Sequence, residues 1–303
     1  RYHILDDEPI SMGLCWEVDS RYFVPRIYIP KFLAILDNNP DVVLAFYNFA
    51  FDGQIARNCG FKLDLLDNIE DVMLMYHILD PDDSKSLKHT CSTYLQIPMG
   101  EYKEVVGTSY PEAIVPGHPD YLRFVDYGTL DAWATYMLYT VFINDLKCEP
   151  DLLDYYQTFE VKQVAALMDM MERGIRLDVE ALKSIRDEYA AQMLDSEKKM
   201  MKLAGEITDK VASTKWLGKI IYENLNYPVV STTPSGAPAT DSDAIEHLIS
   251  MRDHPFLRAI LEYREAQKIV STYCDNILKL LSLRTDTVHT SYNPVGTGTG
   301  RLS

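Results

Sequence analysis

The first half of the chain alternates short apolar runs with longer amphipathic segments. Residues 10–16, 22–28 and 42–47 are runs of strand length, and a short polar turn separates the first two. Helix start and stop signals mark segments at residues 29–36, 52–58, 72–79, 84–95 and 121–145. Strands that alternate with helices in this way predict an α/β domain.

The second half has the pattern of a helical domain. We expect helices at residues 155–173, 179–204 and 214–224, from residue 241, and at 255–281, with a strand at 288–292. No strict heptad runs along the two long segments, which predicts two packed antiparallel helices and not a coiled coil. We place the domain boundary near residues 148–150.

Length and composition fit a two-domain protein. The chain has 303 residues, enough for two cores, and no apolar run approaches ~18 residues, so no membrane span is predicted. Its five cysteines are scattered and form no C-x-x-C pair, which argues against zinc and disulfides and indicates a reducing compartment. The chain begins at Arg1 and stops at Ser303 without a cap or polar tail, so we expect a fragment of a longer protein.

Charge is unevenly distributed along the chain, whose net charge is −16. Residues 1–150 carry 11 basic and 23 acidic side chains, whereas residues 254–303 carry 6 basic and 4 acidic ones. Such a balance argues against a general nucleic-acid coat protein, because the phosphate backbone attracts positive charge. It is compatible with an acidic metal site.

Asp52 is a carboxylate within otherwise hydrophobic sequence, after a predicted strand and at the start of a predicted helix. The N-terminus of a helix stabilises negative charge, so one interpretation is a helix cap. Functional sites also form at strand ends in α/β sheets. The residues around Asp52 leave both interpretations open.

Tyr127 and Asp131 are four residues apart and therefore share one face of the predicted helix. Small and apolar residues follow Asp131. A carboxylate on a packed helix needs a partner, a metal or a functional reason. The alternative is an ordinary surface pair.

Taken together, Asn-Phe-Ala-Phe-Asp at 48–52 and Tyr-Gly-Thr-Leu-Asp at 127–131 resemble two motifs of a known family. They are similar to the second and third motifs of the 3′–5′ exonuclease domain of family A DNA polymerases, the DNA polymerase I type. Residues 71–74 and 86–89 also resemble that domain. The resemblance implies an RNase H-like fold, a mixed sheet flanked by helices, over residues 1–149.

The resemblance also implies roles for these side chains. Asp52 and Asp131 would bind metal, and Tyr127 would orient the attacking water. Asn48 would position the end of the DNA strand or the scissile nucleotide. Two Mg²⁺ or Mn²⁺ ions roughly 4 Å apart would serve the complete exonuclease site. Hard cations need several carboxylates, so two aspartates are only part of the ligand set.

The first motif of the family, Asp-x-Glu, precedes the strand that residues 10–16 resemble. Asp6 and Glu8 have its spacing but lie too close to that strand. We therefore expect the motif upstream of Arg1, with Asp6, Asp7 and Glu8 forming a solvated turn. The alternative is that Asp6 and Glu8 are the ligands.

The second half resembles the polymerase thumb, which we assign to residues 150–286. The matching stretches, in the order of the family, are 213–215, 233–240, 261–264 and 271–273. Residues 288–292 and Thr-Gly-Thr-Gly-Arg-Leu-Ser at 297–303 resemble the entry into the palm, assigned to 287–303. The resemblance implies that Arg301 reaches the primer end and that Ser271 and Thr272 lie near phosphates.

The expected function is part of a DNA-directed DNA polymerase that proofreads with a 3′–5′ exonuclease. Its partners would be a primer-template duplex and a single-stranded 3′ end, with dNTPs bound only by the full-length parent. The expected location is the cytoplasm of a bacterium, or of the host if a phage encodes the protein. The alternatives are a stand-alone exonuclease of the ribonuclease D type and a non-catalytic scaffold with the exonuclease fold.

Overall fold

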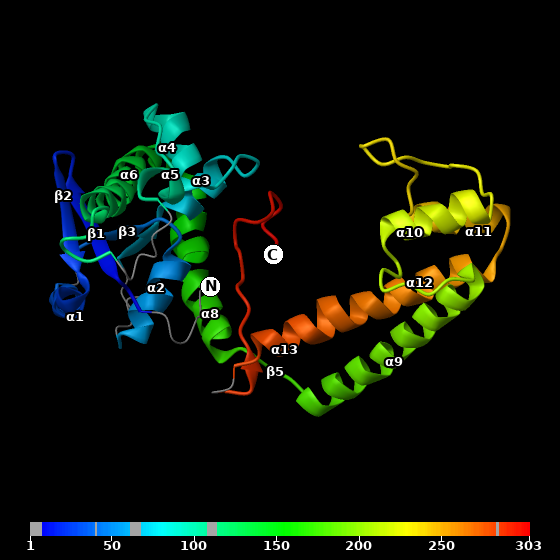
Figure 1. The fold of residues 1–303 in the computed structure, drawn as a ribbon. Helices are drawn as coiled ribbons and strands as arrows, with labels where there is room; N and C mark the ends of the chain where they lie inside the picture. Colours follow the sequence, from blue (N-terminus) through cyan, green and yellow to red (C-terminus); the bar gives the residue numbers. More distant parts are fainter. Residues whose placement is uncertain (1–7, 40, 61–67, 108–113, 283–284) are drawn as a thin grey trace. The chain divides into compact units, whose positions relative to one another are not determined.

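The computed structural model describes residues 8–39, 41–60, 68–107, 114–282 and 285–303 (Figure 1). The chain forms two compact units, one of residues 1–174 and 289–303 and the other of residues 175–288. Asp6 and Asp7, for which two interpretations were left open, lie outside the described residues. None of the helices in the described ranges is long and apolar enough to cross a membrane.

The first unit combines short strands with helices, as the pattern predicts. Its elements, in chain order, are β1 (Ser11–Glu17), β2 (Ser20–Pro25), α1 (Ile29–Asp37), β3 (Leu44–Phe46), α2 (Phe49–Asn58), β4 (Ile69–Asp71), α3 (Val72–Leu79), α4 (Leu87–Leu95), α5 (Tyr102–Val105), α6 (Tyr121–Cys148), α7 (Pro150–Tyr155), a π-helical segment (Tyr156–Glu160) and α8 (Val161–Arg173).

β3 and β4 form a parallel pair, with Leu44 opposite Ile69 and Phe46 opposite Asp71. α2 lies between them in the chain, so the three elements make one β-α-β unit. Because both strands point the same way, their C-terminal ends lie side by side. This register brings Asn48, two residues after β3, next to Asp71 at the end of β4.

Among the described residues, the strands do not join into the mixed sheet that the resemblance implies. The strands there make three separate two-stranded sheets, of which β1–β2 is an antiparallel hairpin. That hairpin packs on α6. The backbone of Gly13 approaches α6 so closely that a Cβ atom would collide with the carbonyl of Gly128. The α/β character of this unit is confirmed, but the finer sheet assignment stays a prediction.

The core of the first unit forms around α3 and α6. Tyr76 on α3 and Phe142 on α6 are fully buried and stack with ring centroids 5.3 Å apart. Tyr94 on α4 meets both rings edge-on. Aromatic clusters of this kind bury large apolar areas and also contribute specific ring contacts. The core therefore fixes α6, the helix that carries Tyr127 and Asp131.

The second unit is mostly helical, as predicted. Its elements are β5 (Ile175–Arg176), α9 (Val179–Ala204), α10 (Thr214–Gly218), a π-helical segment (Lys219–Asn224), α11 (Ser242–Met251), α12 (Pro255–Gln267), a π-helical segment (Lys268–Asp275), α13 (Asn276–Leu280) and β6 (Thr287–Val288). Side chains cap several helix starts: Asp178 accepts from Ala181 N, Ser213 from Trp216 N and Asp241 from Ala244 N.

α9 runs alongside the long segment that α12 begins (Figure 1). Lys199 pairs with Glu262, whereas Arg186, earlier on α9, pairs with Asp275, later in the other segment. The two helices are therefore antiparallel, and the prediction of packed antiparallel helices is confirmed.

Some predicted boundaries are wrong. α2 begins at Phe49 and not at residue 52, so Asp52 lies within the first turn and is not the helix cap. The C-terminal strand is only Thr287–Val288, because its partner β5 has just two residues. The compact units part between residues 174 and 175, after α8, which packs on α2. The division into exonuclease, thumb and palm regions stays a prediction.

Candidate active site

The turn between β3 and α2 places Asn48 and Asp52. Asn48 adopts a left-handed conformation with φ 71° and precedes α2 directly. Asparagine tolerates this conformation better than most residues, because its short polar side chain can bond locally. The turn brings Asp52 into the first helical turn, where the unpaired N–H groups of the helix favour negative charge.

Asp71 holds this turn in place from the neighbouring strand. Its carboxylate accepts hydrogen bonds from the backbone N–H groups of Asn48 at 3.1 Å and Phe49 at 2.8 Å. The same carboxylate caps α3 by accepting from Met73 N at 3.0 Å and Leu74 N at 3.4 Å. One side chain, only 2% exposed, therefore joins the starts of α2 and α3.

The carboxyls of Asp52 and Asp71 are electrostatically linked. Burial, and then the charge of Asp71, raise the pKa of Asp52 to about 7. Burial also raises the pKa of Asp71 to about 6, although its four backbone hydrogen bonds favour the charged form. Perturbed carboxyls of this kind are common at functional sites. The surroundings of Asp52 therefore disfavour the ionised form of its carboxyl, and a cation bound nearby would favour it.

Tyr127 and Asp131 lie on the same face of α6, as their spacing predicts. The ring of Tyr127 packs edge-on against Tyr102, with centroids 5.5 Å apart. Lys88 on α4 contacts both residues: its Nζ lies 4.9 Å from the centroid of the Tyr127 ring and 3.6 Å from Asp131 Oδ1. Lys88, Tyr127 and Asp131 together form what we call the α4–α6 corner.

Asp131 is partly buried in this corner, with its side chain 31% exposed. Burial raises the pKa of its carboxyl, and the charge of Lys88 opposes that shift without cancelling it. Its Oδ1 atom is buried and has no hydrogen-bond partner within the described part of the chain. Unpaired buried carboxylate oxygens are costly, and the Lys88 ammonium, 3.6 Å from this atom, offsets part of that cost.

The structure thus brings the predicted residues into two groups: Asn48 and Asp52 beside Asp71, and Tyr127 and Asp131 beside Lys88. Convergence of Asp52 with Asp131 stays a prediction. Lys88 and Asp71 were not among the residues singled out from the sequence. Their roles depend on contacts between distant segments, and the only sequence signal was their place in stretches 71–74 and 86–89.

The described residues do not complete a site for two divalent ions. They contain no cluster of three or more His, Cys, Asp or Glu side chains with the geometry of a metal site. Glu8 forms an ion pair with Arg26. Two aspartates supply too few oxygens for two hard cations, and one of them already faces the ammonium group of Lys88.

Ser271, Thr272 and Arg301 are exposed. Ser271 Oγ donates to Gln267 O at 2.7 Å, within the helical segment that follows α12. Arg301 lies in a loop that reciprocal backbone hydrogen bonds between Asn293 and Ser303 close, at 2.8 and 3.1 Å. Thr297 Oγ1 accepts from Arg301 N at 3.0 Å, so the loop has a defined turn. The DNA contacts expected of these three residues stay predictions.

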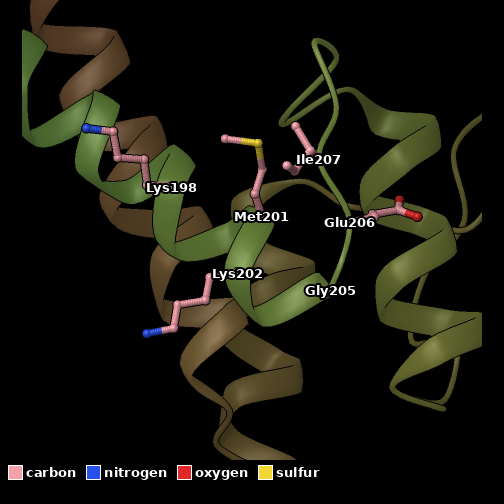
Figure 2. Close-up of a pocket in the computed structure, with 6 residues that line it drawn as sticks. All are labelled: Lys198, Met201, Lys202, Gly205, Glu206 and Ile207. Carbon is pink, nitrogen blue, oxygen red and sulfur yellow. The ribbon is translucent and has the colours of Figure 1, made fainter.

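A shallow pocket lies at the C-terminal end of α9 in the second unit (Figure 2). None of the predicted site residues lines it. Its lining consists of the residues labelled in Figure 2: Lys198, Met201, Lys202, Gly205, Glu206 and Ile207. The side chains of Lys198 and Lys202 both point away from Ile207, one toward the upper left and the other toward the lower left of the view (Figure 2).

Comparisons with known proteins agree with the expected resemblance. Residues 179–303 match the family model of DNA polymerase family A. Over 299 residues the chain is 30% identical to the DNA polymerase I of Synechocystis sp., a match that covers 98% of this chain and 28% of that protein. It is 32% identical over 289 residues to the DNA polymerase I of Chloroflexus aurantiacus, covering 92% of this chain and 30% of that protein.

A solved structure has a similar fold. It is the POL domain of Pol1 from M. smegmatis in complex with a DNA primer-template and dNTP. The TM-score is 0.69 at 22% sequence identity, and the match covers 93% of this chain and 46% of that one. The chain therefore spans less than a third of the two relatives and about half of this structure.

Proposed function

We propose, for a chain that belongs to DNA polymerase family A, that it forms the exonuclease and thumb regions of a DNA-directed DNA polymerase. The single observation that supports this best is the similarity to DNA polymerase I over 98% of the chain, across both compact units. The chain spans only 28% of that relative, so polymerisation would depend on further parts of the parent protein. Its partners would be a primer-template duplex and a single-stranded 3′ end, in the cytoplasm, with dNTPs bound by the full-length parent.

The first unit would be an RNase H-like 3′–5′ exonuclease domain. Asp52 and Asp131 would contribute carboxylates, Tyr127 would orient a water molecule, and Asn48 would position the terminal nucleotide. Mg²⁺ or Mn²⁺ would supply charge stabilisation when bound. The two described aspartates are too few for this task, so further ligands would have to come from other parts of the parent.

The helical unit would be the thumb. Thumb contacts to DNA go mainly to the backbone and position the duplex without reading its sequence. Ser271 and Thr272 are exposed hydroxyl residues on one helical segment, which suits contacts to phosphates. Arg301 would reach the primer end. The family match over residues 179–303 argues against a stand-alone exonuclease of the ribonuclease D type.

One observation favours a second candidate, a non-catalytic scaffold. Lys88 already neutralises Asp131, and the described residues include no cluster of three metal ligands. In a decayed exonuclease, these aspartates would no longer be needed for hydrolysis. The two candidates differ in whether the parent protein removes 3′ nucleotides.

The test is removal of 3′ nucleotides from single-stranded DNA by the full-length parent with Mg²⁺. We expect Asp52→Ala and Asp131→Ala each to lower this rate about 100-fold or more, because each removes charge stabilisation at the reacting centre. The 303-residue chain alone should cleave only weakly. Asp126→Ala is the matched control, since Asp126 lies on the same helix but pairs with Arg21. An inactive parent would support the scaffold, whereas unchanged cleavage by both site variants would show that Asp52 and Asp131 are not the catalytic carboxylates.

A further inference from the structure

We propose that Tyr156 is a positioning residue of the candidate active site, because its hydroxyl holds the end of β4, which in turn holds the turn before α2. This inference rests on the proposed function, since that turn carries Asn48 and leads into Asp52. Tyr156 acts through the backbone and carboxylate of Asp71 and not by contact with DNA.

The Tyr156 hydroxyl has a partner on each side at the end of β4. It accepts a hydrogen bond from Asp71 N at 2.9 Å and donates one to Glu70 Oε2 at 2.7 Å. Tyr156 is fully buried, and its ring packs in the core of the first unit. A buried hydroxyl that both accepts and donates has a fixed direction, so it restrains the backbone of Asp71.

Asp71 passes this restraint on to the turn before α2. Its carboxylate accepts from the N–H groups of Asn48 and Phe49, at 3.1 and 2.8 Å. Asn48 has a φ of 71°, a left-handed conformation that a residue other than glycine keeps only where the surroundings hold it. The two bonds to Asp71 are part of what holds it, and they depend on where β4 ends. A chain of contacts therefore runs from Tyr156 through Asp71 to the turn.

The hydroxyl of Tyr156 can be separated from the packing of its ring. Tyr156 lies 85 residues after Asp71 in the chain and begins the π-helical segment Tyr156–Glu160. Turns of π-helix are rare and often occur at functional sites. A phenylalanine ring would fill the same space in the core, so the hydroxyl contributes through its two hydrogen bonds alone. Removing it tests the chain of contacts without creating a large cavity.

Amide hydrogen exchange of the 303-residue chain, followed by mass spectrometry, measures how firmly the turn is held. Exchange is compared over times at which the α6 amides around Phe142 keep their protons, so that only local opening contributes. In Tyr156→Phe, we expect the amides of Asn48 and Phe49 to exchange about tenfold faster, because the carboxylate that accepts from them is less well fixed. A residue that served only the stability of the core would leave this local exchange unchanged.

Glu70 offers a second variant that leaves the Tyr156 ring and hydroxyl in place. Glu70→Ala removes the acceptor that directs the hydroxyl, so the same two amides should exchange about threefold faster. Glu70→Gln supplies an amide oxygen as acceptor and should restore slow exchange. Tyr155→Phe is the matched control, because the Tyr155 hydroxyl donates to Glu160 Oε1 at 2.5 Å within the same stretch of helix. It should leave the exchange of both amides unchanged.

In the full-length parent, Tyr156→Phe should lower kcat for removal of 3′ nucleotides about tenfold and leave KM nearly unchanged, because a displaced turn costs alignment in the transition state. Tyr155→Phe should keep kcat. Unchanged exchange of the two turn amides, exchange that rises together with that of the α6 core, or an unchanged kcat in an active Tyr156→Phe parent would overturn the proposal. A parent that removes no 3′ nucleotides would count against the proposed function, whereas the exchange result would still decide whether Tyr156 holds the turn.

Discussion

Asp83 shows how a single half-buried side chain can tie a loop to the core. Its carboxylate accepts hydrogen bonds from the Tyr76 hydroxyl, from His89 Nε2 at 2.9 Å and from Ser84 N at 2.7 Å. These hydrogen bonds lower the pKa of Asp83 from 3.8 to about 2, and the bond from Tyr76 has the largest effect. A hydrogen-bonded carboxylate with a depressed pKa stabilises the folded state only while it is ionised.

Replacing Asp83 with Asn should therefore make stability less dependent on pH in the acid range. The carboxylate contributes above pH 3.8, its ordinary pKa, and the contribution is lost as pH falls through about 2. We expect Asp83→Asn to have a lower free energy of unfolding than the unchanged chain at pH 6, with the difference shrinking between pH 4 and 2. Urea unfolding at a series of pH values measures this, with Asp19→Asn on the exposed hairpin turn as control. A difference that stays constant with pH would contradict the linkage.

The roles of individual side chains could be predicted from the sequence only where those side chains belong to a local motif. Tyr127 and Asp131 share a helix face because they are four residues apart, and that much follows from the helical period. Asp71 and Lys88 have no such local signature. They contact residues on other elements, and only the folded chain brings those side chains together.

At the scale of elements, Asp71 is the residue that links the strand ends to the helices. It ends β4, caps α3 and accepts from the first residues of the turn into α2. Asp52 depends on this arrangement, because its place in the first turn of α2 is set by where that helix begins. The β-α-β register therefore controls the candidate site through one buried carboxylate.

We expect Asp71→Ala to lower the free energy of unfolding by about 3 kcal/mol, because it leaves several buried N–H groups without an acceptor. Asp71→Asn should cost less, about 1 kcal/mol, since an amide oxygen can still accept and the buried charge is removed. Urea unfolding at pH 7 measures both. Asp178→Ala, which removes a cap with one hydrogen bond at an exposed helix start, serves as comparison and should cost about 1 kcal/mol. Equal losses for Asp71→Ala and Asp178→Ala would show that the link between the elements adds nothing.

Element types could be predicted better than sheet pairing. The helix at 72–79 was placed correctly, because an apolar segment follows a capping aspartate. The mixed sheet that the resemblance implies stays a prediction, since β3 and β4 have only three residues each and the hairpin packs on α6, where Gly13 permits the close approach. Strand partners depend on such contacts between distant segments, which periodicity does not contain.

For the whole molecule, the resemblance was the strongest signal in the sequence, since it covered both halves. The family match supports it over residues 179–303, and the similarity to the DNA polymerase I of Synechocystis sp. covers 98% of the chain. The sequence did not show where the two compact units part. In the sequence α8 looks like one more helix of the second half, but in the structure it packs on α2 of the first unit. Charge gives a second molecule-wide signal. Residues 1–150 are strongly acidic, whereas residues 254–303 carry an excess of basic side chains.

This charge difference leads to a prediction that separates the two activities. Arg301 is exposed in the C-terminal loop and belongs to the basic stretch, so its guanidinium is available to phosphates of a primer-template. In the full-length parent, Arg301→Ala should lower primer extension about tenfold, because a contact at the primer end is lost, and leave hydrolysis of single-stranded DNA within about twofold. Arg258→Ala is the control, since that arginine is held by Asp253. Equal loss of extension and hydrolysis in Arg301→Ala would mean that the loop serves the fold or the nuclease, because a primer contact would affect extension alone.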